Sequence, residues 1–150
     1  MKTIIKNGMV VSPAETYEAD ILIDGEQIRC IGRDLADEEA RVIDAAGKYV
    51  IPGAVDVHTH MDLQAGSSRA VDDFYDGTVA AACGGTTSIV DHMAFGPAGC
   101  GLHHQLAEYH RLADGKAVID YGFHGVAQHV NRGILDELEA MAEDGVPSIK

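Results

Sequence analysis

The chain has 150 residues with 24 acidic and 11 basic side chains, which gives a formal net charge of −13 at pH 7, and 46% of its residues are hydrophobic. This length suits one ordinary domain or part of a larger one, and the hydrophobic content suits a globular protein with a sizeable core. No run of Lys or Arg forms a basic patch, so nucleic acids and anionic membrane surfaces are poor candidate partners.

Signals for export or membrane insertion are missing from the sequence. The N-terminal residues lack a long apolar segment and a small-residue cleavage site, and no run approaches the roughly 20 apolar residues of a membrane span. The three cysteines are scattered and odd in number, which is not a disulfide framework. We therefore expect a cytoplasmic protein.

Residues 1–50 have the pattern of a small β layer. Asn7-Gly8 and Asp24-Gly25 each lie between runs of β-branched residues, which predicts two hairpins, and Ala46-Gly47 predicts a third turn. Hairpins of this kind need a partner sheet to be stable, so we expect the layer to be incomplete in this chain.

From residue 51 a strand–helix unit repeats about every 30 residues, the length of a βα unit with its return. The predicted buried strands are 53–57, 86–91, 117–123 and 147–150, and the helical patterns between them are 71–85, 101–115 and 131–145. Each helical pattern ends at a glycine, as helix C-termini prefer. Successive βα units predict a parallel sheet, either doubly wound or closed into a (β/α)8 barrel. No glycine-rich phosphate-binding motif follows the first strand, which disfavours nucleotide-binding folds.

The number of units bears on the length of the whole protein. A closed barrel takes about 250 residues, and this chain holds three full units and the start of a fourth. Left alone, the last strand would be an open parallel edge. We therefore expect the chain to be the N-terminal part of a longer protein.

Two histidines end the first predicted strand of this repeat. His58 and His60 are two residues apart, so on a strand both point to the same side, and the C-terminal end of a barrel strand is where active sites are built. Neutral imidazole nitrogens are ligands that zinc prefers, so this pair predicts a metal site. Asp56 lies on the same face, where it could orient an imidazole or pair locally.

Several segments together carry a family resemblance: IKNG near the start, YVIPGAVDVHTHMDL, DDFYDGTVAAACGGTTSIVDH, KAVIDYGFH and the terminal SIK. They resemble the hydantoinase/dihydropyrimidinase family of cyclic amidohydrolases, and the DHMAFGPAGC segment is similar to bacterial D-hydantoinases of the phenylhydantoinase type. The resemblance implies a (β/α)8 barrel preceded by a small β-sandwich domain. Residues 1–50 would be the N-terminal part of the sandwich, and residues 51–150 the first βα units of the barrel.

The same resemblance implies a set of metal ligands. Such enzymes carry two zinc ions, or other divalent metals, bridged by a carboxylated lysine; His58 and His60 would bind the more buried ion and Lys150 would be that lysine. A desolvated lysine amine can be neutral and capture CO₂, so Lys150 is expected at a buried strand end. The remaining ligands, an aspartate that shuttles the proton and a tyrosine that stabilises the oxyanion would lie beyond this chain.

The implied activity is hydrolysis of the cyclic amide bond of hydantoins or dihydropyrimidines to N-carbamoyl amino acids, with a hydroxide between the metals as nucleophile. The implied partners are a small cyclic amide substrate and further copies of the chain, in a homotetramer or dimer. Two alternatives stay open: an allantoinase or dihydroorotase-like enzyme, and a non-catalytic dihydropyrimidinase-related scaffolding protein. The presence of His58, His60 and Lys150 disfavours the scaffolding protein.

Residues after the histidine pair are expected to line the substrate pocket. At this position dihydroorotases have a motif similar to His-x-His-x-Arg, in which the arginine holds the substrate carboxylate. This chain has Asp62 in place of the arginine. A carboxylate would repel an anionic substrate, so Asp62 favours a neutral cyclic diamide. Ala65 stands where D-hydantoinases commonly have an aromatic residue, which leaves room for a larger substituent. The expected pocket residues are Asp62, Leu63, Ala65 and Phe95.

Two further histidines end later strands of the repeat. His92 and His124 follow the second and third predicted strands, so they could face the same mouth and serve as additional ligands. The family resemblance assigns neither of them a metal, and favours pocket lining or structural hydrogen bonding instead.

Overall fold

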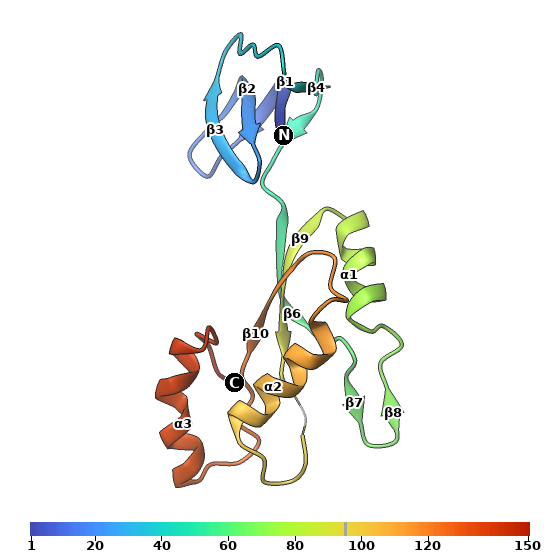
Figure 1. Ribbon diagram of the computed structural model, residues 1–150, viewed down its shortest axis with the longest axis vertical. Coiled ribbons are helices and arrows are strands. Elements are labelled where there is room, and N and C mark those ends of the chain that lie inside the picture. Colours follow the sequence, from blue (N-terminus) through green and yellow to red (C-terminus); the bar gives the residue numbers. More distant parts are fainter. Residues whose placement is uncertain (95) are drawn as a thin grey trace. The chain divides into compact units, whose positions relative to one another are not determined.

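The computed structural model describes residues 1–94 and 96–150, which form two compact units, Met1–Pro52 and Gly53–Lys150 (Figure 1). Within the described residues no helix has the length and apolar character that a bilayer crossing requires.

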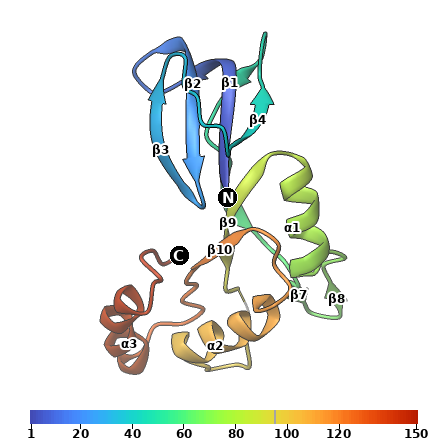
Figure 2. The ribbon, with the colours of Figure 1, turned by 45° about the horizontal axis from the view of Figure 1, so that its top comes forward.

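The first unit is a β-sheet whose strands are ordered β3-β2-β1-β4, with β5 also paired to β1 (Figure 2). Strand β1 is antiparallel to β2, and β2 to β3, whereas β4 and β5 run parallel to β1. The strands are β1 (Lys2–Val11), β2 (Thr16–Asp24), β3 (Gln27–Gly32), β4 (Arg41–Asp44) and β5 (Tyr49–Val50).

Of the two hairpins predicted from Xaa-Gly pairs in this unit, one is confirmed. Asp24-Gly25 leads into the β2–β3 hairpin, and Gly25 takes the positive φ of +62° that the turn requires. The Asn7-Gly8 hairpin is wrong, because β1 runs straight through it with a bulge between Ile5 and Gly8. Asn7 has a φ of +61°, and its N–H donates to the Asp20 carboxylate at 2.9 Å. The left-handed residue therefore forms a bulge rather than a turn.

The second unit alternates strands and helices, as predicted, around a parallel sheet ordered β10-β9-β6. Its strands are β6 (Ala54–Thr59), β9 (Thr86–His92) and β10 (Asp120–His124), with a small hairpin of β7 (Gln64–Ala65) and β8 (Ser68–Arg69). Its helices are α1 (Phe74–Cys83), α2 (Leu102–Ala113) and α3 (Arg132–Glu143). The predicted fourth strand at 147–150 is represented by one parallel bridge, between Gly125 and Ile149.

The helix boundaries follow local capping chemistry. Asp73 caps α1 by accepting N–H groups of the first turn, and Asn131 does the same for α3. Glycines with positive φ, Gly85, Gly115 and Gly145, follow the three helices. Helix α2 has no side-chain cap of its own at Gly101, and α3 supplies one through Glu137, which accepts the Leu102 N–H.

The core of the second unit lies where the helices pack on the sheet. Its centre holds Phe74, Ile89, Met93, Leu102 and Met141, each almost completely buried. The first strand departs from the prediction of a buried strand, since Val55 and Val57 of β6 are 58% and 67% exposed. Strand β6 is the edge of the three-stranded sheet, and among the described residues no strand pairs with its outer side.

Candidate metal centre

Histidines gather at one end of the parallel sheet. His58 lies near the end of β6, His60 directly after it, His92 at the end of β9 and His124 at the end of β10. The sheet register places His92 opposite His124. Because parallel strands end at the same edge, four imidazoles from three strands meet there.

Three of these side chains form a cluster with metal-binding geometry. His58, His60 and His92 each offer a ring nitrogen, and these three atoms lie within 4.8 Å of one another. The Nε2 atoms of His58 and His60 are 3.2 Å apart, and the His92 ring stacks on that of His58 with 3.9 Å between centroids. The structure thus brings together the two histidines predicted from the sequence and adds His92.

The protonation of these imidazoles suits a cation. Burial, followed by the charges of His58, His124, His60 and Lys150, lowers the pKa of His92 to about 4. Burial, followed by His58 and Lys150, also lowers the pKa of His60. Both rings are therefore neutral at pH 7, the form that binds metal. Each also has a buried Nδ1 with no hydrogen-bond partner among the described residues. This donor set fits a divalent metal such as zinc.

Lys150 approaches the cluster from the end of the chain. Its N–H donates to the Gly125 carbonyl at 2.8 Å and its carbonyl accepts from Ala127 at 3.0 Å, which ties it to the segment after β10. Its charge lowers the pKa of His60 and His92. We expected Lys150 to be buried at a strand end, but in the described part of the chain its side chain is exposed.

Two aspartates support the histidine-bearing strand. Asp56 pairs locally, because its Oδ1 accepts the backbone N–H of His58 at 3.1 Å. Asp91, at the second-last position of β9, is 0% exposed, and its Oδ2 accepts from Thr59 Oγ1 at 2.8 Å and from the Met61 N–H at 2.7 Å. Burial raises the pKa of Asp91 to about 7, opposed by these two hydrogen bonds. Sequence analysis missed this residue, although an acid inside a predicted buried strand was a usable signal.

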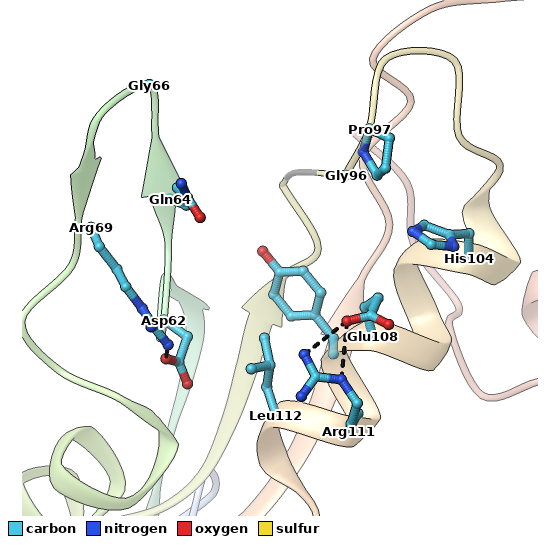
Figure 3. Close-up of a pocket in the computed structure, with 11 residues that line it drawn as sticks. Asp62, Gln64, Gly66, Arg69, Gly96, Pro97, His104, Glu108, Arg111 and Leu112 are labelled. Carbon is cyan, nitrogen blue, oxygen red and sulfur yellow. Dashed lines mark hydrogen bonds and ion pairs between the residues drawn. The ribbon is translucent and has the colours of Figure 1, made fainter.

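The predicted pocket residues lie partly on a separate groove of about 650 Å³ between the β7–β8 hairpin and α2 (Figure 3). Asp62 lines this groove, whereas Leu63 and Ala65 are not among its lining residues, and Phe95 lies outside the described residues. The side chain of Asp62 is buried and ion-paired with Arg69. The free negative charge assumed from the sequence is therefore compensated.

Comparison of the sequence with known proteins identifies relatives of this chain. No protein-family model matches the chain. It is 52% identical over 151 residues to the D-phenylhydantoinase of Escherichia coli O1:K1, an alignment that takes in 100% of this chain and 33% of that protein. The chain thus spans about a third of the length of the curated relatives it matches.

Solved structures give the same picture for the fold. The dihydropyrimidinase from Brevibacillus agri NCHU1002 superimposes with a TM-score of 0.94 at 49% identity, over 99% of this chain and 32% of that one. The D-hydantoinase from Bacillus sp. AR9 superimposes with a TM-score of 0.92 at 48% identity, over 98% and 32% of the two chains. Both units of this chain therefore have counterparts in these proteins.

Proposed function

We propose that this chain, which belongs to the hydantoinase/dihydropyrimidinase family, supplies part of a two-zinc centre that hydrolyses the ring amide bond of hydantoins or dihydropyrimidines to N-carbamoyl amino acids. The observation that carries the proposal is the pair of His58 and His60 ring nitrogens, 3.2 Å apart at the end of a parallel strand. Imidazole nitrogens are ligands that zinc prefers, and two of them this close at a strand end are suited to one cation.

The first role is metal binding. His58 and His60 would hold one ion, with His92 beside them in the same cluster. When bound, zinc would lower the pKa of a water to about 7 and polarise the amide carbonyl. The strand end would hold the ring nitrogens of His58 and His60 close enough together to share that ion.

The second role falls to Lys150. We propose that its neutral amine adds to CO₂ and releases a proton to solvent, which gives a carbamate anion whose oxygens would serve as metal ligands and offset part of the positive charge. The tether of its backbone to Gly125 and Ala127 supports the proposal, because it holds residue 150 beside the ends of the strands. The remaining ligands and the acid–base aspartate would come from segments that the relatives have beyond the aligned third.

The wider architecture is also a proposal. Three parallel strands in chain order, each followed by a helix, suit the start of a (β/α)8 barrel. Residues 51–150 would be its first units, and residues 1–50 part of a small β-sandwich. We also propose that the protein forms a homotetramer or dimer and that it is located in the cytoplasm.

We infer the substrate class from the charges of Asp62 and Arg69, which follow the end of β6 in the chain. Arg69 is ion-paired with Asp62, so its guanidinium is not free to form the paired hydrogen bonds by which an arginine recognises a substrate carboxylate. We therefore propose a neutral cyclic diamide or ureide. An allantoinase and a dihydroorotase-like enzyme share the metal chemistry and differ in the ring that they accept.

Hydrolysis assays with the purified, zinc-loaded full-length protein, which holds this chain together with the segments that supply the remaining ligands, test the proposal. We expect clear turnover of 5-phenylhydantoin, weak turnover of allantoin and negligible turnover of dihydroorotate. Removal of the metal with a chelator should abolish turnover, and re-addition of zinc should restore it. Undiminished activity after complete metal removal, or no hydantoin hydrolysis by fully loaded protein, would contradict the proposal.

A further inference from the structure

We infer that Asp91 is a positioning residue for the metal centre, because its carboxylate holds both chain neighbours of His60, Thr59 by its hydroxyl and Met61 by its backbone N–H. The inference rests on the proposed function, since it concerns how one of the proposed ligands is held. The hydrogen bonds of Asp91 reach Thr59 and Met61 and not the imidazole rings, so Asp91 acts through the chain that carries His60.

The contacts bracket one ligand. A single oxygen of Asp91 accepts from the hydroxyl of Thr59 at 2.8 Å and from the N–H of Met61 at 2.7 Å. Thr59 and Met61 are the two neighbours of His60 in the chain. Since the carboxylate comes from β9, it ties the end of β6 to the adjacent strand at this point.

The sheet cannot supply this restraint by itself. The pairing of β6 with β9 is irregular between Asp56 and Thr59, where three steps along β6 match two along β9. Strand β6 then ends at Thr59, so the N–H of Met61 lies outside the ladder. The Asp91 carboxylate provides the acceptor where the ladder is interrupted.

The other restraints on the His60 ring come from the cluster itself, where its Nε2 lies 3.2 Å from that of His58 and its ring contacts that of His92. Its Nδ1 is buried without a hydrogen-bond partner among the described residues, so that atom does not orient the ring there. On the far side, the Met61 side chain packs where α1 has Gly77, whose added Cβ would lie 2.2 Å from the Met61 sulfur. The placement of His60 therefore depends on how its two neighbours are held.

A purely structural role fits Asp91 less well. A carboxylate that is 0% exposed has a large desolvation cost, and its Oδ1 has no hydrogen-bond partner among the described residues. An apolar pair would join two strands without that cost. A retained buried acid that grips the neighbours of a metal ligand is better explained by the precision that a metal site needs.

The test compares Asp91→Ala, Asp91→Asn and Thr59→Val with a control, Asp120→Ala, which removes the same charge from the exposed start of β10. Cobalt(II) is titrated into the metal-free protein, and the visible spectrum of the cobalt form reports ligand geometry. We expect Asp91→Ala to weaken cobalt binding by about tenfold or more and to change the spectrum. Thr59→Val, which loses one of two hydrogen bonds, should show a smaller loss, and Asp120→Ala should match the wild type.

The asparagine variant separates position from charge. Asp91→Asn removes the charge but keeps an oxygen that can accept the Met61 N–H, so it should restore cobalt affinity and spectrum part of the way to wild type. Equal losses in Asp91→Asn and Asp91→Ala together with a wild-type Thr59→Val would overturn the inference, because charge alone would then explain the effect. If Asp91→Ala fails to fold by circular dichroism, wild-type spectra for both Thr59→Val and Asp91→Asn would overturn it. Cobalt binding that His58→Ala leaves unchanged would instead contradict the proposed function.

Discussion

At the scale of single residues, burial and the neighbouring imidazoles lower the pKa of His60 and His92 and keep both rings neutral. A cationic imidazole there would be buried and would lie against other imidazoles. These surroundings leave the two rings neutral, which is the form in which a ring nitrogen can bind a metal ion. The cluster is therefore prepared for a metal rather than for an ion pair.

Replacing His58 or His60 with alanine should remove most of the bound zinc, because each residue supplies a ring nitrogen of the cluster. The fold should persist, since these side chains lie at a strand end outside the main core. Metal analysis with circular dichroism checks both expectations. His104→Ala, on the exposed face of α2, is the matched control and should keep its metal; full zinc content in both test variants would refute the ligand assignment.

The sequence was sufficient to predict that the side chains of His58 and His60 lie together, because a two-residue spacing on a strand fixes a common face. His92 was left open and Asp91 was missed. Their contribution depends on the register between β6 and β9, which brings residues about 30 positions apart together. Local spacing carries no information about that register.

At the scale of elements, the two Xaa-Gly pairs of the first unit show how a tertiary contact decides between a turn and a bulge. Asp24-Gly25 has free space around it, whereas a Cβ on Gly8 would lie 2.5 Å from Val50. Asp20, from the paired strand, holds the bulge at Asn7. Asn7-Gly8 forms a bulge because it lies within β1, between β2 and β5. Asp24-Gly25 forms a turn because the chain reverses there, between β2 and β3.

Asp20 should be a main determinant of stability in this unit. Its carboxylate accepts the N–H groups of Asn7 and Leu35, at 2.9 and 3.0 Å. Asp20→Asn replaces one acceptor with a donor, so we expect a loss of about 1–3 kcal/mol at pH 7. Thermal unfolding measures the loss, with Glu18→Gln on the exposed face of β2 as the control.

The pH dependence of this effect has a defined sign. The hydrogen bond from Asn7, followed by that from Leu35, lowers the pKa of Asp20 in the folded state despite burial. Its stabilisation is therefore present above the unfolded pKa near 3.8 and is lost as the pH falls through the lower folded value. The gap between wild type and Asp20→Asn should narrow below about pH 4; a constant gap down to pH 2 would exclude the hydrogen-bonded carboxylate as its source.

Tyr121 joins β10 to the end of α2. Its hydroxyl donates to Asp114, the residue that ends the helix, and this bond, with burial, raises the pKa of Tyr121 to about 12. Stability from this contact is complete below pH 10 and is lost as the pH rises through 12. In an alkaline absorbance titration, Tyr121 should give a late ionisation step, and Tyr121→Phe should remove that step. A late step that persists in Tyr121→Phe would assign it to another residue.

At the scale of the whole molecule, the alternation of strands and helices was predictable from period and capping residues, and the parallel order β10-β9-β6 follows from it. Burial was not predictable in the same way. Val55 and Val57 have the composition of a core strand and yet are exposed, because burial depends on what lies beside β6 and not on β6 itself. Closure into a barrel remains a proposal for the same reason.

We propose above all that His58, His60 and Lys150 belong to one two-metal centre. The most direct test of this proposal is anomalous diffraction at the zinc edge from crystals of the zinc-loaded protein. The account predicts two zinc peaks, one on the nitrogens of His58 and His60, with a carboxylate on Lys150 Nζ between the two ions. A bare amine at Lys150, or no zinc at the two histidines in fully loaded protein, would contradict it.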